Sequence, residues 1–267
     1  MTDIIRKAYA DCSAGQIHLS HIDGPATPAV FLHQTASSGK MWHKVMRALA
    51  GSRALYALDT PGFGGSFDPP QDATPSIRDY ARWFLETLDT LGIDRLHLAG
   101  HHTGACIAVE LASLAPDRIA SISLIGPVPL TAEERVEFSH HFGTPFRPGV
   151  SGAYLLDNWE YLRNLGAHAD PLLIHREMSD QLRAWWGRVQ SYGAVWDYDF
   201  TAAYVALSCP VMIGAAPTDV LAAYLGRAIS LRPDARVMAL EGANFEPDLD
   251  TDNVARELAG FFSACES

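Results

Sequence analysis

Positive charge is scarce in this chain of 267 residues. Lys and Arg number 20 against 31 Asp and Glu, which leaves a formal net charge of -11 at pH 7. Because nucleic acids and anionic membranes are bound mainly through Lys and Arg patches, and no basic run occurs, we expect neither partner. No apolar run approaches the ~18 residues of a membrane span, and no signal-peptide pattern opens the chain. These absences predict a cytoplasmic enzyme or binding protein.

Cysteine is also rare and scattered. The four cysteines, Cys12, Cys106, Cys209 and Cys265, show no CxxC spacing. This spacing predicts reduced thiols rather than a disulfide framework or a zinc site. The hydrophobic fraction of 48% is high enough for one large core, as expected for a chain of this length.

Short apolar runs alternate with amphipathic segments, which is typical of βα units around a mainly parallel sheet. We expect strands at 16–22, 29–33, 54–59, 96–100, 119–125, 211–214 and 237–240, and helices at 38–49, 76–91, 103–114, 219–231 and 251–262. From residue 130 to about 201 this rhythm stops, and charged, aromatic helical pieces are broken by Gly and Pro. We therefore predict a core domain of residues 1–129 and 202–267, with residues 130–201 inserted as a helical cap.

A predicted strand meets a predicted helix at Gly100-His101-His102-Thr103-Gly104. Glycines at both ends leave space around a strained residue, here His102, whose side chain is lifted above the sheet. This context is typical of a nucleophile elbow. Two further segments carry loop motifs, Phe31-Leu32-His33-Gln34-Thr35 and Asp59-Thr60-Pro61-Gly62-Phe63-Gly64-Gly65-Ser66. On these three segments the chain resembles the α/β-hydrolase superfamily over essentially its whole length.

The resemblance implies an α/β-hydrolase fold, with a mainly parallel eight-stranded sheet flanked by helices and an inserted helical cap. The catalytic positions depart from the family pattern. The family carries Ser, Cys or Asp at the elbow, where this chain has His102, and no histidine follows His175. Asn244 fills the position of the family's catalytic His, and Asp219 follows a strand where the family carries its acid. These residue types exclude a Ser-His-Asp acyl-enzyme mechanism.

We predict that His102, Asn244 and Asp219 form an altered catalytic set. In this hypothesis Asn244 accepts a hydrogen bond from one ring nitrogen of His102 and donates one to Asp219, which fixes the tautomer. The other ring nitrogen then acts as a general base, because an unperturbed imidazole pKa of about 6.5 suits work near neutral pH. Attack by His102 itself is an alternative, but it gives Asn244 no role.

The resemblance places an oxyanion hole at the backbone N–H groups of Thr103 and of Gln34 or Thr35. Charge stabilisation would then be independent of the catalytic side chains. The hydroxyls of Thr103, Ser37 and Ser38 are candidate replacements for the missing nucleophile, but none lies at the elbow tip. We therefore favour a base that activates water.

Structural interpretations compete with each of these roles. His102 is alternatively the remnant of a decayed site, Asn244 a turn residue, and Asp219 the first residue of a helix. His33 and His101 flank the elbow and are predicted to contact the substrate. Their spacing does not support a metal site shared with His102 and Asp219, so we expect no metal.

The predicted cap is rich in aromatic residues, with four of the six tryptophans. Among these, Trp159, Trp186 and Trp196 are predicted to contact the ligand. Aromatic linings favour an apolar or aromatic small molecule over a sugar or a peptide.

Three functions stay open at this point. The first is hydrolysis of an ester, lactone or activated C–C bond by water that His102 activates. The second is removal of a substrate proton by His102, which gives a lyase, isomerase, decarboxylase or cofactor-free oxygenase. The third is ligand binding by an inactive site. We favour hydrolysis on the resemblance; the sequence implies no cofactor, and a homodimer is one open oligomeric state.

Overall fold

The computed structural model describes residues 4–266, and its strands form one sheet. The strands are β1 (Arg6–Cys12), β2 (Gly15–Ile22), β3 (Ala26–Leu32), β4 (Arg53–Leu58), β5 (Leu96–His101), β6 (Ile119–Ile125), β7 (Val211–Gly214) and β8 (Arg236–Val237). Their order across the sheet is β1-β2-β4-β3-β5-β6-β7-β8. The β1–β2 and β2–β4 pairs are antiparallel, and the other described pairs are parallel. The sheet is therefore the mainly parallel eight-stranded one that was expected.

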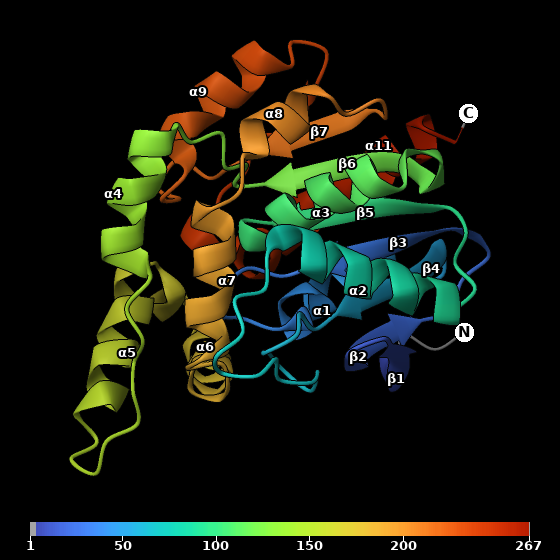
Figure 1. The fold of residues 1–267 in the computed structure, drawn as a ribbon. Coiled ribbons are helices and arrows are strands. Elements are labelled where there is room, and N and C mark those ends of the chain that lie inside the picture. The colour runs from blue at the N-terminus through green and yellow to red at the C-terminus, as the bar shows by residue number, and fades with distance from the viewer. Residues whose placement is uncertain (1–3, 267) are drawn as a thin grey trace.

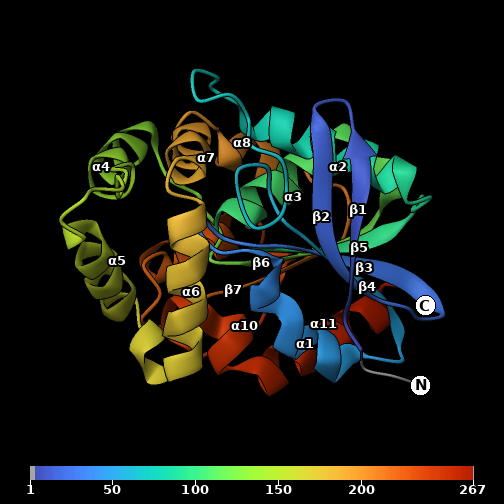
Figure 2. The same ribbon diagram turned by 90° about the horizontal axis from the view of Figure 1, so that it is seen from below.

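Helices cover both faces of this sheet (Figures 1 and 2). They are α1 (His43–Leu49), α2 (Ile77–Thr90), α3 (Thr103–Leu114), α4 (Ala132–Phe142), α5 (Ala153–Asn164), α6 (Pro171–Arg183), α7 (Gly187–Trp196), α8 (Phe200–Val205), α9 (Ala222–Leu231), α10 (Glu246–Leu249) and α11 (Thr251–Ala264). Short 3-10 turns are η1 (Gly39–Trp42), η2 (Pro116–Arg118), η3 (Ala167–Ala169) and η4 (Ala243–Phe245). Helices α2, α3, α8 and α9 share one apolar cluster, and α1 and α11 share the other. The site therefore rests on a sheet that is covered on both sides.

Burial on both faces explains the sequences of the central strands. Every residue of β5 and β6 is buried, as expected for parallel strands that read as nearly continuous apolar runs. At the start of α2, the Ser76 hydroxyl accepts a hydrogen bond from the Asp79 amide, and the Asp79 carboxylate accepts one from the Ser76 amide. This reciprocal cap fixes the start of the helix. None of the described helices combines the length and apolar character that a membrane crossing requires.

Helices α4 to α8 lie between β6 and β7. The predicted insertion of residues 130–201 contains α4 to α7 and ends within α8, and α4 to α7 stand beyond the carboxyl ends of the strands (Figure 1). Helix α6 is tied to the loop after β3 by side chains. Ser38 donates to Asp180 at 2.7 Å, and Lys40 forms an ion pair with Asp180 at 2.8 Å. This side of the insertion is thus held firmly against the sheet. The four cysteines are free, as their spacing predicts.

Candidate active site

His102 lies between the end of β5 and the first residue of α3. Its backbone has φ 48° and ψ -108°, a sparsely populated conformation that a non-glycine residue adopts only when its surroundings impose it. The flanking glycines allow this turn, because a Cβ on Gly100 would overlap the Gly104 carbonyl and a Cβ on Gly104 would overlap the Leu32 carbonyl. The sequence pattern therefore does produce a strained elbow with His102 at its tip.

The ring of His102 packs against the backbone of Gly126, the residue that follows β6. Gly126 has φ 61°, and a Cβ on it would overlap the imidazole. Glycine is the residue that combines this backbone conformation with the missing side chain. Gly126 thus leaves room for a ring much larger than the usual elbow side chain.

The imidazole contacts Asp219 directly. Nε2 of His102 lies 2.7 Å from Oδ2 of Asp219, and the other carboxylate oxygen accepts the Leu221 amide at 2.6 Å. Nδ1 of His102 has no hydrogen-bond partner among residues 4–266, and His102 lines a cavity. The neutral ring thus donates to Asp219 from Nε2 and holds a lone pair on Nδ1 for a ligand.

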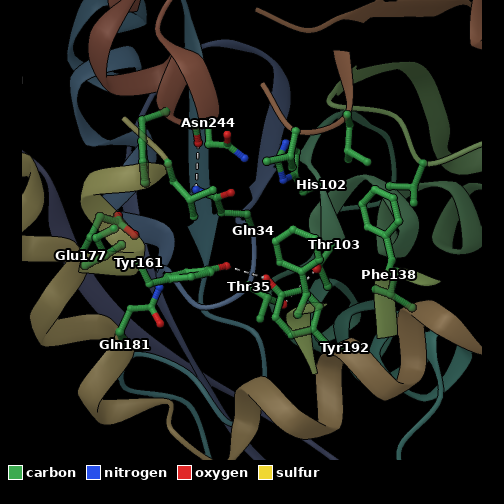
Figure 3. A pocket seen from close by; sticks show the side chains of 18 of the residues that line it. Gln34, Thr35, His102, Thr103, Phe138, Tyr161, Glu177, Gln181, Tyr192 and Asn244 are labelled. Atoms are coloured by element: carbon green, nitrogen blue, oxygen red, sulfur yellow. Dashed lines mark hydrogen bonds between the residues drawn. The ribbon is translucent and has the colours of Figure 1, made fainter. Parts of the chain in front are cut away.

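The predicted position of Asn244 between His102 and Asp219 is wrong. The elbow brings the imidazole close enough to the acid that no intermediate side chain fits between them. The Asn244 carbonyl instead accepts a hydrogen bond from Nε2 of Gln34 at 3.0 Å, while the side-chain Oδ1 is buried without a partner. Asn244 still lines the cavity beside His102 (Figure 3), so its amide faces a ligand rather than the acid.

The acid controls the protonation of this pair. Burial opposes a charged ring, but the negative charge of Asp219 and the hydrogen bond to it outweigh burial and raise the pKa of His102. Burial likewise opposes the carboxylate, yet His102 lowers the pKa of Asp219. The ring is therefore a stronger base than a free imidazole.

A second histidine and acid lie behind the first pair. The rings of His101 and His102 stack with centroids 4.3 Å apart, and Nε2 of His101 lies 2.8 Å from Oε2 of Glu246. Oε1 of Glu246 accepts the Ala216 amide at 3.0 Å, in the loop that carries Asp219. The side chains of His101 and Glu246 are fully buried. The prediction that His101 contacts the substrate is therefore wrong, because His102 covers it.

The buried pair is neutral at neutral pH. Burial and then the neighbouring His102 lower the pKa of His101 well below its usual value. Burial and then the charge of Asp219 raise the pKa of Glu246 to about 8. Both shifts favour the uncharged forms of His101 and Glu246, which are in contact through Nε2 and Oε2.

Ligand atoms of His101, His102 and Asp219 lie within 4.8 Å of one another, which is close enough for a shared metal ion. Each Nε2 meets a carboxyl group. We interpret the cluster as a hydrogen-bond network.

His33 is a structural residue at the end of β3. Its Nδ1 donates to the Gln34 carbonyl at 2.7 Å, and its Nε2 accepts the Thr60 amide at 2.9 Å. Burial lowers the pKa of His33, which keeps the ring neutral in this role. The predicted substrate contact of His33 is wrong, because both nitrogens hold the loops together.

Of the three tryptophans predicted to contact the ligand, one lines the cavity and two do not. Trp196 lines the cavity, as predicted. Trp159 lies outside the lining and is 36% exposed, and Trp186 donates from its indole nitrogen to the Gln71 carbonyl at the surface. Their predicted ligand contacts are wrong, because neither residue lines the cavity.

The cavity contains about 580 Å³ of space outside protein atoms, part of which is open to solvent. Most of its wall is apolar or aromatic, including Phe138, Phe142, Leu162, Val195, Trp196 and Phe245. One end is formed by Gln34, Thr35, His102, Thr103 and Asn244 (Figure 3). The predicted oxyanion-hole residues and His102 therefore line the same cavity.

Three hydroxyls link the walls of this end. The Thr35 hydroxyl lies 2.9 Å from that of Thr103 and 2.7 Å from that of Ser191 on α7. Thr103 is the first residue of α3, whose N–H has no partner inside the helix. The chain thus brings the loop after β3, the start of α3 and the inserted helices to one point.

Four residues of the site escaped sequence reasoning: Gly126, Glu246, Glu177 and Gln181. Glu177 and Gln181 lie on α6 and line the cavity. Their spacing of four residues beside buried Leu173 places them on one helix face. This spacing is the sequence pattern from which the two polar residues could have been predicted to lie on one face of a helix.

Comparison with known proteins bears on the fold and the site. Residues 27–147 match the family model described as alpha/beta hydrolase fold. A fluoroacetate dehalogenase from a Burkholderia species is 25% identical over 282 residues, covering 95% of this chain and 93% of that protein. The solved structure of a thermophilic esterase from Thermogutta terrifontis has a TM-score of 0.78 at 18% identity, covering 99% of this chain and 100% of that one. The α/β-hydrolase fold predicted from the sequence is confirmed.

Another relative matches over part of its length. The dihydrolipoyllysine-residue acetyltransferase component of the acetoin cleaving system from Pseudomonas putida is 38% identical over 156 residues, which are 58% of this chain and 39% of that protein. The chain spans less than half the length of the first curated relatives it matches.

Proposed function

We propose that this chain, which has the α/β-hydrolase fold and matches that family model over residues 27–147, is an enzyme of the α/β-hydrolase superfamily that hydrolyses an ester, lactone or activated C–C bond with His102 as general base. One observation carries this proposal: Nε2 of His102 contacts Asp219 at 2.7 Å, while Nδ1 has no hydrogen-bond partner among residues 4–266 and His102 lines the cavity. A base needs a lone pair toward the reactants and a partner that stabilises the protonated ring. His102 meets both conditions.

The proposed reaction proceeds through activated water. Nδ1 of His102 accepts a proton from a water molecule as the water oxygen bonds to the substrate carbonyl carbon. The carbonyl oxygen becomes an oxyanion, held by the backbone N–H of Thr103 and that of Gln34 or Thr35. The oxyanion then re-forms the carbonyl and expels the leaving group, which takes the proton from Nδ1. Asp219 stabilises the imidazolium between these two steps.

The cavity supports an apolar or aromatic small molecule as substrate. Its apolar wall contributes affinity by burying apolar surface, at about 25 cal/mol per Å². The few polar groups at the catalytic end orient the carbonyl. The esterase named among the solved structures supports an ester in particular.

Removal of a carbon-bound proton from the substrate is the second candidate function. The observation that favours it is the side chain at the elbow: His102 offers a base where a hydroxyl or carboxylate nucleophile would stand. In that reaction the same backbone N–H groups hold an enolate instead of a tetrahedral intermediate. No water is consumed, which separates the two candidates.

The deciding experiment measures turnover of aromatic and short-chain p-nitrophenyl esters and lactones from pH 5 to 9. We expect hydrolysis by the wild type and its loss, by about 10²- to 10⁴-fold, in His102→Ala. Turnover in H₂¹⁸O should place one ¹⁸O atom in the acid product. Equal turnover by the His102→Ala variant would remove the base assignment, and product without ¹⁸O would favour the second candidate.

A further inference from the structure

The cavity has a second polar end, formed by α6 of the insertion. Glu177 and Gln181 line it, although only 1% and 4% of their surfaces are exposed. Figure 3 shows both side chains on the side of the cavity away from His102, beside Tyr161. Buried polar side chains ordinarily have all their hydrogen-bonding groups paired. The hydrogen bonds of Glu177 and of Gln181 therefore show which of their polar atoms remain for a ligand.

Glu177 uses one of its two carboxylate oxygens. Oε1 accepts from the Ser37 hydroxyl at 2.8 Å and from the Arg176 guanidinium. Within residues 4–266, Oε2 has no hydrogen-bond partner. Arg176 also pairs with Asp248 at 2.7 Å, so its charge is shared between two carboxylates. The side chain is thus held rigidly by Oε1 and keeps an acceptor, Oε2, for a ligand.

Gln181 is held in a similar way one turn later. Its Oε1 accepts from Arg188 at 3.0 Å, and its amide Nε2 has no partner in the described part of the chain. Arg188 is buried and lies over the rings of Tyr161 and Tyr192, at 4.5 and 5.2 Å. It has no carboxylate within ion-pair distance among the described residues. This fixed guanidinium orients the Gln181 amide so that Nε2 remains for a ligand.

We propose that Glu177 and Gln181 form a subsite for a neutral hydroxyl group of the substrate, remote from the reacting carbonyl. Residues four apart on a helix are neighbours, so one hydroxyl donates to Oε2 of Glu177 while it accepts from Nε2 of Gln181. A carboxylate would meet the charge of Glu177, and an ammonium would meet Arg176 and Arg188. The substrate is therefore a hydroxylated molecule with an apolar or aromatic middle.

This inference rests on the proposed function, because it assigns the far end of the same substrate cavity. A test by binding keeps the two separable. The probes are aryl methyl ketones, which have a carbonyl but no leaving group, with a hydroxyl at the far end of chains of one to four methylenes. Each is compared with its methyl, carboxylate and ammonium counterparts by calorimetric titration. The proteins are wild type, Glu177→Gln, Gln181→Met and Glu110→Gln.

We expect one chain length at which the wild type binds the hydroxyl probe about tenfold more tightly than its methyl counterpart, as two buried hydrogen bonds allow. The preference should fall several-fold in Glu177→Gln and in Gln181→Met. Glu110→Gln is the matched control: this buried carboxyl lies on α3 outside the cavity lining, and its hydrogen bonds go to Arg78 and Tyr198 rather than to α6, so the preference should persist.

The His102→Ala variant, tested both for binding of the hydroxyl probes and for ester turnover, separates the two proposals. Loss of ester turnover with an intact hydroxyl preference supports both, and turnover independent of His102 with an intact preference overturns the proposed function alone. The subsite is wrong if the wild type shows no hydroxyl preference at any length, if the carboxylate or ammonium probe binds best, or if both α6 variants keep the preference. Folding of each variant is checked by its thermal midpoint, and either α6 variant that folds suffices.

Discussion

Replacing Asp219 by Asn is expected to separate the two forces that act on the pKa of His102. In the wild type, burial opposes the charged ring, but the Asp219 carboxylate outweighs it and raises the pKa above 6.5. The Asp219→Asn substitution would leave burial in place and remove the negative charge. The pKa of His102 should therefore fall below 6.5 in this variant. In the proposed reaction activity depends on the neutral ring, so the acidic limb of the profile of kcat/KM should move from above to below that pH.

The plateau of turnover should fall at the same time. The amide introduced by Asp219→Asn has no charge to stabilise the imidazolium, and it can hold the wrong tautomer by donating to Nε2 of His102. A loss of about 10²- to 10⁴-fold corresponds to about 2.7 to 5.4 kcal/mol in the activation free energy. Direct titration of the imidazole by NMR, with His102→Ala to assign its signals, measures the pKa without any substrate.

Glu110→Gln is the control for this prediction. Glu110 is a buried carboxyl on α3, bonded to Arg78 and Tyr198 and outside the cavity lining. It should leave both the pKa of His102 and the acidic limb in place. An Asp219→Asn variant with an unmoved limb and an unmoved NMR titration would refute the assignment of Asp219 as the partner of His102.

Two other variants test the surroundings of the pair. Gly126→Ala places a methyl group where the His102 ring lies, so turnover should fall about 10²-fold or more while circular dichroism stays native; wild-type turnover would show that the ring has another position. Glu246→Gln tests a stability effect: because the pKa of Glu246 is raised from 4.5 to about 8, the stability it contributes is present below pH 4.5 and is lost as pH rises toward 8. The variant should therefore lose less free energy of unfolding between pH 5 and 8 than the wild type, as measured by urea denaturation; parallel curves would contradict the raised pKa.

The central part of the fold could be predicted from the sequence because its strands are buried on both faces. The predicted β6 and β7 have the observed bounds, and α3 begins and ends as expected. Strand β1 was missed, because it lies at the sheet edge and most of its residues are exposed, so no burial pattern marks it. The last strand was expected at 237–240 but comprises Arg236–Val237. It pairs with one neighbouring strand, β7. Beyond it the Met238 amide still donates to the Ile213 carbonyl at 2.9 Å, and Met238 and Leu240 are buried, but the ladder does not continue.

The parts of the site that depend on local backbone geometry could be predicted from the sequence. The contacts between side chains of different loops could not. The elbow follows from two glycines within five residues, and the acid from its place after a strand. The contact between His102 and Asp219 joins residues 117 apart, and the one between His101 and Glu246 joins residues 145 apart. Side-chain types and lengths alone did not determine which ring meets which acid. That depends on how far each loop reaches over the sheet.

The loop after β8 positions the side chains around His102 instead of supplying the imidazole. Its Glu246 accepts the Ala216 amide through Oε1, in the loop that carries Asp219, and meets His101 through Oε2. His101 in turn stacks on His102. One side chain therefore braces the acid from one direction and the base from the other, and both contacts are buried where water cannot compete for them. The loop after β8, which carries Asn244 where the resemblance implies a histidine, thus braces His102 through Glu246 and His101.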